Sequence, residues 1–152
     1  MLVTKSNNSA SSLMLDKDIN VYQTPKMHWR WKVDNILTKG DVRFKESDDL
    51  PIRIYVVFKG RFLKISTLNY VWANKQHSKK FFTSTYSDKV KIIIMQDDRI
   101  GSWQKEEVDI VEDYLTVFGT KPPKIAKVFI MSDSDNTGGK VTAYLDYLDI
   151  SA

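Results

Sequence analysis

The chain has 152 residues, a net charge of +4 and no cysteine. This length suits one domain with a sizeable core, and the missing thiols exclude disulfides, cysteine nucleophiles and cysteine-ligated metal centres. The lysines are scattered among acidic residues and no run of about 18 apolar residues occurs, so we expect neither a nucleic-acid partner nor a transmembrane segment.

The first fifty residues contain one clear strand. Residues 1–12 are expected to be a loop or a frayed lead-in, because positions 5–12 are rich in Ser and Asn, and residues 13–21 indicate a weak strand pair. Apolar and polar residues alternate strictly over residues 27–33, which predicts a strand with one buried face that includes Trp29 and Trp31. Residues 38–50 are charged and predict a long loop.

The rest of the chain is a series of alternating segments with one helical interruption. Strands are predicted over residues 52–58, 68–72, 90–95, 103–110, 125–131 and 140–150. Val111, Leu115 and Phe118 have helical spacing ahead of Gly119, which predicts one short helix over residues 111–118. The sequence therefore predicts a mainly β, single-domain protein over residues 1–152, an antiparallel β-sandwich of the jelly-roll type.

Several polar side chains occupy the centres of strongly patterned strands. Arg30, Arg53 and Asn69 each lie on the side of a strand opposite its apolar residues, and Tyr55 follows on the same side as Arg53. If the strands are neighbours, these residues converge on one outward sheet face, where guanidinium and amide groups bind vicinal hydroxyls or carboxylates and a tyrosine ring stacks. The alternative is an ordinary solvent-facing surface with cross-strand pairs.

The segment over residues 133–138 alternates acidic and small polar residues. Asp133, Asp135 and Asn136 fit three interpretations: a turn whose side chains bond their own backbone, a contact to a ligand, and a Ca²⁺ site. A twelve-residue calcium loop would need Glu at position 144, where the chain has Tyr144, so the segment does not match that loop fully. Calcium is the one candidate cofactor, and we expect no other.

Three functional classes remain open from the residues alone. A non-catalytic module would bind a saccharide or similar polar ligand. A polysaccharide hydrolase would use Glu106 with Asp133 or Asp135 as acid and base, and it needs two carboxyl groups roughly 5–10 Å apart across a cleft. A structural or assembly protein would show exposed edge strands and a large apolar patch.

Six motifs occur in a fixed order along the chain. They are residues 29–33 (WRWKV), 48–49 (DD) before 53–56 (RIYV), 68–72 (LNYVW), Trp103 with Glu106, 113–114 (DY) with 118–119 (FG) and 122–123 (PP), and 133–138 (DSDNTG). In this order they resemble the bacterial domain-of-unknown-function family DUF3047 over roughly residues 9–150. One departure is Val108-Asp109, where the family pattern has Arg-Asn, so a role for an arginine at position 108 is not transferred.

The resemblance implies a bacterial source and a periplasmic or secreted location, and it implies that an N-terminal strand or more precedes this region in relatives. It supplies no activity. More distantly, residues 144–150 are similar to the closing strand of galactose-binding-like and other carbohydrate-binding sandwiches, which is weak support for function. We therefore expect a non-catalytic saccharide-binding module that uses Arg30, Arg53, Tyr55 and Asn69, together with Asp133, Asp135 and Asn136.

Overall fold

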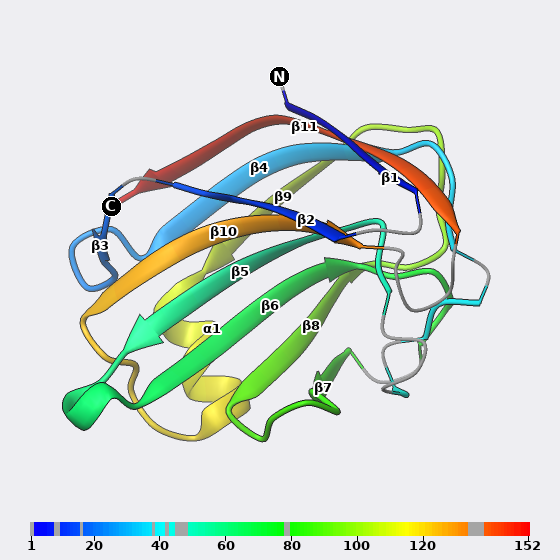
Figure 1. Cartoon of the computed structure of the whole chain (residues 1–152). Coiled ribbons are helices and arrows are strands. Elements are labelled where there is room, and N and C mark those ends of the chain that lie inside the picture. Colours follow the sequence, from blue (N-terminus) through cyan, green and yellow to red (C-terminus); the bar gives the residue numbers. More distant parts are fainter. Residues whose placement is uncertain are drawn as a thin grey trace.

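The computed structural model describes residues 2–7, 10–15, 17–37, 39–41, 43–44, 49–77, 80–133 and 139–152. Within these ranges the strands form two stacked sheets (Figure 1). The four-stranded sheet has the order β1 (Leu2–Asn7), β11 (Lys140–Ser151), β4 (Lys26–Val33) and β9 (Gln104–Asp109). The seven-stranded sheet has the order β2 (Ala10–Met14), β10 (Ile125–Asp133), β5 (Ile52–Lys59), β6 (Ile65–Trp72), β8 (Val90–Gln96) and β7 (Phe81–Thr83), and β3 (Ile19–Asn20) pairs with β10.

The core lies between the two sheets and is rich in aromatic rings. Trp29 and Trp31 are fully buried on β4, as the alternation predicts, and their rings pack edge to face at 5.3 Å. Tyr70 and Trp72 approach them from β6, with ring centroids 5.6 Å from Trp29 and 5.5 Å from Trp31, respectively. Such aromatic pairs add stability beyond the area that they bury, so these four rings hold the two sheets together.

One helix completes the core. Helix α1 (Ile110–Phe118) begins where the side chain of Asp109 accepts a hydrogen bond from the Glu112 amide, and it ends at Gly119, whose φ of 77° is left-handed. Both features agree with the helix predicted over residues 111–118. Tyr114 lies 4.8 Å from the ring of Phe58, so α1 packs against the part of the seven-stranded sheet that the narrower sheet leaves uncovered (Figure 1).

The predicted strands are present, and three features of the fold differ from expectation. Residues 2–7 and 10–12 belong to strands rather than to the expected loop: β1 pairs with β11, and β2, which extends into the predicted weak strand pair, pairs with β10. Backbone hydrogen bonds join these edge strands to their neighbours, and a Ser- and Asn-rich segment forms such bonds even though it lacks an alternating apolar pattern. One pair, β6 with β8, is parallel within otherwise antiparallel sheets. Pairing of β11 with β4 shifts between Leu145 and Tyr147, and this bulge returns Leu148 to the core.

No helix in the described ranges is both long and apolar enough to cross a bilayer.

Candidate functional site

The candidate site lies on the outer face, which is the face of the seven-stranded sheet turned away from the four-stranded sheet. Arg53 and Tyr55 of β5 and Asn69 of β6 share this face, because Ile52, Ile54, Leu68 and Tyr70 alternate with them into the core. Tyr55 stands directly opposite Asn69 in the antiparallel pair. The guanidinium carbon of Arg53 lies 5.8 Å from the centre of the Tyr55 ring. The structure thus brings together three of the four predicted strand residues.

This part of the outer face is not the open surface that the sequence suggested. Arg53 is only 3 % exposed and Asn69 only 1 % exposed, whereas Tyr55 is half-buried. A second, smaller core lies on the same outer face, where Leu50 and Phe82 pack over the sheet. Its sheet residues are Val71, Ala73, Ile92 and Ile94. Tyr55 is therefore the accessible member of the three, and Arg53 and Asn69 lie beneath the surface.

A buried amide fixes the loop that precedes β5 onto this face. Asn74 is 4 % exposed; its Oδ1 accepts a hydrogen bond from the Leu37 amide and its Nδ2 donates to the Asp49 carbonyl, both at 2.7 Å. A β-carbon at position 40 would collide with the Asn74 amide group and would be 2.7 Å from the Asp49 carbonyl oxygen, so only glycine fits there. Asn74 thus ties two points of the loop to the end of β6.

Charged groups in the same loops reinforce this cover. The carboxylate of Asp41, 5 % exposed, accepts hydrogen bonds from Arg43 Nη2 at 2.7 Å and Nε at 2.9 Å, and Lys75 Nζ lies 3.8 Å away. The hydrogen bond from Arg43 is the main cause that lowers the pKa of Asp41 to about 2. Burial lowers the pKa of His77, whose ring packs 5.3 Å from Phe82. His77 is thus a neutral packing residue at pH 7.

A groove lies on the outer face at the C-terminal end of β5, away from Arg53. Its volume is about 320 Å³, and Val57, Lys127 and Phe129 line it together with Ile65 and the Lys59 side chain. Phe129 stands opposite Tyr55 in the pairing of β10 with β5, so two half-buried rings adjoin the groove. Lys127 Nζ is 3.6 Å from an Asp18 carboxylate oxygen at its edge. The groove combines apolar walls with a few charged groups, which is the usual composition of a ligand site.

Sequence reasoning missed the groove residues. Phe129 and Lys127 belong to an apolar stretch of β10, Ile125 to Met131, in which both faces of the strand are covered over part of its length. Alternation is weak in such a strand, so the outward position of Phe129 becomes visible only through its pairing with Tyr55.

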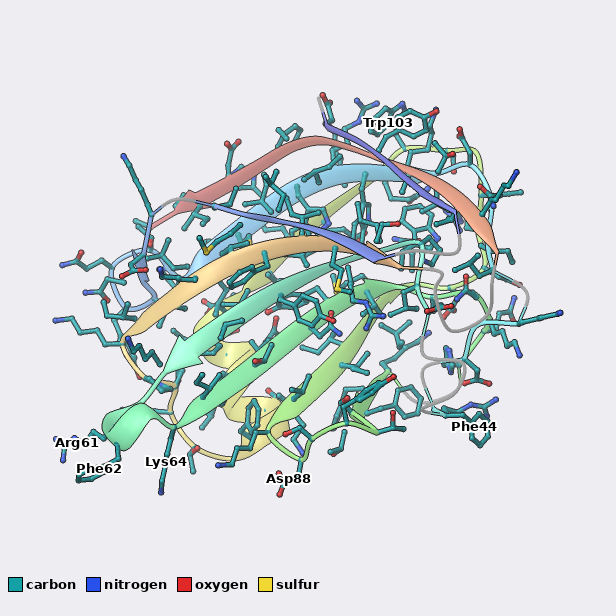
Figure 2. All side chains as sticks on the ribbon, viewed as in Figure 1. Phe44, Arg61, Phe62, Lys64, Asp88 and Trp103 are labelled. Atoms are coloured by element: carbon teal, nitrogen blue, oxygen red, sulfur yellow. The ribbon has the colours of Figure 1, made fainter. Side chains whose placement is uncertain are left out.

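Arg30 does not belong to this site, which corrects the expectation that it converges with Arg53 and Asn69. It lies on β4 in the other sheet, because alternation fixes the side of a strand and not the sheet that contains it. Its Nη1 donates to Asp146 Oδ2 at 2.8 Å, and its guanidinium stacks 4.4 Å from the centre of the Trp103 ring. Figure 2 shows Trp103 at the edge of the molecule formed by the four-stranded sheet.

Of the three carboxylates proposed for hydrolysis, Glu106 is the one whose side chain lies among the described residues. Glu106 is 9 % exposed on the inward side of β9, where its Oε1 accepts a hydrogen bond at 2.7 Å from Gln96 of β8, and burial raises its pKa. The side chains of Asp133 and Asp135 lie outside the described residues, so the acid–base pair of the hydrolase hypothesis stays a prediction.

The candidate calcium segment is only partly described. Asp135 and Asn136 lie outside the described residues, and of Asp133 only the backbone position at the end of β10 is described. Among the residues whose side chains are described, no group of three His, Asp or Glu side chains is placed to hold a metal ion.

The chain matches one protein family and resembles two solved structures. The family model described as "Protein of unknown function (DUF3047)" matches residues 1–149. A search of the curated proteins finds no match. Among solved structures, a thermostable cellulase derived from Cel12A of Rhodothermus marinus aligns with a TM-score of 0.51 and 8% identity, over 93% of this chain and 72% of that chain. The endoglucanase 3 of Trichoderma harzianum, from family GH12, aligns at 0.45 and 10% identity, over 92% of this chain and 68% of that chain.

At this identity the Rhodothermus cellulase supports the fold alone, a two-sheet β-sandwich of the jelly-roll type. The family match covers nearly the whole chain and agrees with the six ordered motifs. The chain belongs to the DUF3047 family.

Proposed function

We propose that the outer face of the seven-stranded sheet binds a saccharide or a similar polar ligand without changing it chemically. Tyr55 and Phe129 supply the contact surface, and the ligand extends along the groove lined by Val57 and Lys127. A flat sugar face packs well on an aromatic ring, and the charged rim of the groove offers hydrogen bonds to hydroxyl groups.

The observation that carries the proposal is the buried polar group of Asn69 beside Tyr55. The side-chain oxygen of Asn69 is buried and has no hydrogen-bond partner among the described residues. Buried polar atoms without partners are uncommon in folded proteins and often mark a place where a ligand or water completes the bonding. Asn69 stands directly opposite Tyr55, so a hydroxyl group that enters beside the ring would satisfy this oxygen.

Arg53 has a supporting role in this account. Its guanidinium lies 5.8 Å from the Tyr55 ring and holds the ring by a cation–π contact. With 3 % exposure it is a positioning residue for Tyr55 rather than an open hydrogen-bonding surface.

Binding is favoured over hydrolysis by the residues that the face presents. The outward side chains described on β5, β6, β8 and β10 include no carboxylate in the strand centres, and Asp18 at the rim forms an ion pair with Lys127. A glycosidase needs an acid and a base or nucleophile on either side of the scissile bond. The cellulase with the same fold type makes a saccharide the first ligand class to test.

The test is a glycan array probed with the purified protein, followed by calorimetry on any saccharide that binds. We expect Tyr55→Ala to weaken binding roughly five- to 150-fold, since a stacking contact of this kind is worth roughly 1–3 kcal/mol. Tyr147→Ala is the matched control, because Tyr147 is a half-buried tyrosine on the exterior of the four-stranded sheet. Absence of any saccharide ligand, or equal losses in both variants, would count against the proposal.

A further inference from the structure

A second cavity lies at the end of the sandwich where α1 finishes and the β5–β6 hairpin turns. Its volume is about 700 Å³. Much of its lining is apolar and comes from Ile65, Tyr114, Phe118 and Pro123. The Tyr114 and Ser66 hydroxyl groups are already joined by a hydrogen bond of 2.7 Å. The cavity therefore offers chiefly apolar contacts, and it is larger than the groove on the outer face.

Basic side chains surround this cavity. Arg61, Lys64, Lys89 and Lys121 line it together with a single acidic residue, Asp88. Within the described part of the chain, none of the four basic residues has an ion pair, whereas Arg43 near the opposite end has Asp41 at 2.7 Å. The residues that line this cavity thus carry an excess of three positive charges beside its apolar walls.

The hairpin tip adds an aromatic residue that nothing covers. Phe62 is 92 % exposed and has φ 56° and ψ 35°, a left-handed conformation that is rare for a bulky residue. The turn is closed by a hydrogen bond of 2.7 Å from the Gly60 amide to the Lys64 carbonyl, which presents residues 61–63 at the tip. Figure 2 shows Arg61, Phe62 and Lys64 projecting beyond the body of the molecule. Strain combined with exposure of an aromatic ring points to a function for this tip.

We propose that this end of the protein docks on the surface of an anionic lipid bilayer. Phe62 enters the boundary between head groups and acyl chains, and Arg61 and Lys64 beside it bind lipid phosphates while their aliphatic stems stay in apolar surroundings. Lys89 and Lys121 contact further phosphates, and the apolar cavity between them receives part of one lipid.

Charge and shape favour this partner over two others. A second copy of the chain would bring two cationic ends together, since a two-fold interface places each patch against itself. A nucleic acid would use the positive charge and leave the protruding Phe62 and the apolar lining without a role. An anionic bilayer uses both features. The docking end adjoins the saccharide groove, with which it shares Ile65, but it needs no saccharide.

The test is co-sedimentation of the whole chain with vesicles. We expect binding to mixed phosphatidylglycerol and phosphatidylcholine, weakening as salt rises, and no binding to phosphatidylcholine alone. Lys64→Gln and Lys121→Gln should each weaken binding roughly fivefold, the effect of one basic residue near an anionic surface. Phe62→Asn should weaken it roughly tenfold. Asparagine tolerates the left-handed conformation, so this variant should remain as stable as the parent, which a thermal unfolding curve checks.

Phe44→Asn is the matched control. Phe44 is 55 % exposed beside Arg43, which Asp41 neutralises, and Figure 2 shows it far from the hairpin tip. We expect this variant and Tyr55→Ala to keep full vesicle binding, which separates the docking end from the saccharide site. Failure to bind anionic vesicles, an equal loss in Phe44→Asn, equally tight binding of a DNA duplex, or a dimer that Phe62→Asn dissociates would each overturn the proposal.

Discussion

Asn74 is the residue whose loss should most clearly release the cover of the outer face. Asn74→Ala removes both bonds to the loop before β5 and leaves the Leu37 amide and the Asp49 carbonyl without these partners. A buried group that loses its partner costs about 1–3 kcal/mol, so the two together predict a loss of about 2–6 kcal/mol in the free energy of unfolding. That is a large share of the stability of a typical domain.

Urea denaturation followed by tryptophan fluorescence measures this loss, and hydrogen exchange shows where it acts. We expect faster exchange in the loop and at Val71, Ile92 and Ile94, because Leu50 above them is carried by that loop. Gln76→Ala is the control, since Gln76 is an exposed amide in the same segment and its loss should change stability by less than about 0.5 kcal/mol. A loss below about 1 kcal/mol for Asn74→Ala would refute the anchoring role.

Gly40 provides an independent check of the same contact. Gly40→Ala should destabilise the protein because a β-carbon there meets the Asn74 amide and the Asp49 carbonyl. Removing the Asn74 side chain relieves one of these two collisions. The combined variant should therefore be more stable than the sum of the single losses predicts, and strict additivity would contradict the arrangement.

Three further predictions concern titration and metal binding. Asp41→Asn should lower the free energy of unfolding at pH 7 by up to about 2 kcal/mol, since the Asp41 pKa is about 2 in the fold, below the usual 3.8. The difference in stability between the variant and the parent should shrink as pH falls from about 4 toward 2. A difference in denaturation midpoints that does not change with pH would contradict this prediction. Glu106→Gln should stabilise the protein at pH 7, because burial raises the Glu106 pKa and the charged form is disfavoured in the fold. This gain in stability should vanish below about pH 4, where the Glu106 carboxyl group is protonated. A variant that is less stable than the parent at pH 7 would show that the charged carboxylate stabilises the fold. Addition of Ca²⁺ or EDTA should leave the thermal midpoint unchanged, whereas a calcium-dependent rise would favour a metal site in residues 133–138.

The sequence predicts those elements whose pattern is locally complete. Strict alternation identified β4 and β5, and the helical spacing before Gly119 identified α1 within one residue. Strand β1 and residues 10–12 of β2 were missed because edge pairing depends on backbone bonds with distant partners, which no local apolar pattern records. The parallel pairing of β6 with β8 is likewise a property of topology.

The same limit applies to the candidate site. Alternation placed Arg53, Tyr55 and Asn69 correctly on the side of their strands that faces away from the main core. It could not show that Arg30 belongs to the other sheet, since both sheets have an exterior. Nor could it show that Arg53 and Asn69 are buried beside a second core that contains Leu50, because that packing joins residues distant in sequence.

The most direct test of the saccharide site is an NMR titration of the isotope-labelled protein with the saccharide selected on the array. Ligand binding on the outer face predicts chemical-shift changes at Tyr55, Val57, Asn69, Lys127 and Phe129, with the amides of β4 and β9 unaffected. Changes confined to the four-stranded sheet around Arg30 and Trp103 would contradict this account of where the ligand binds.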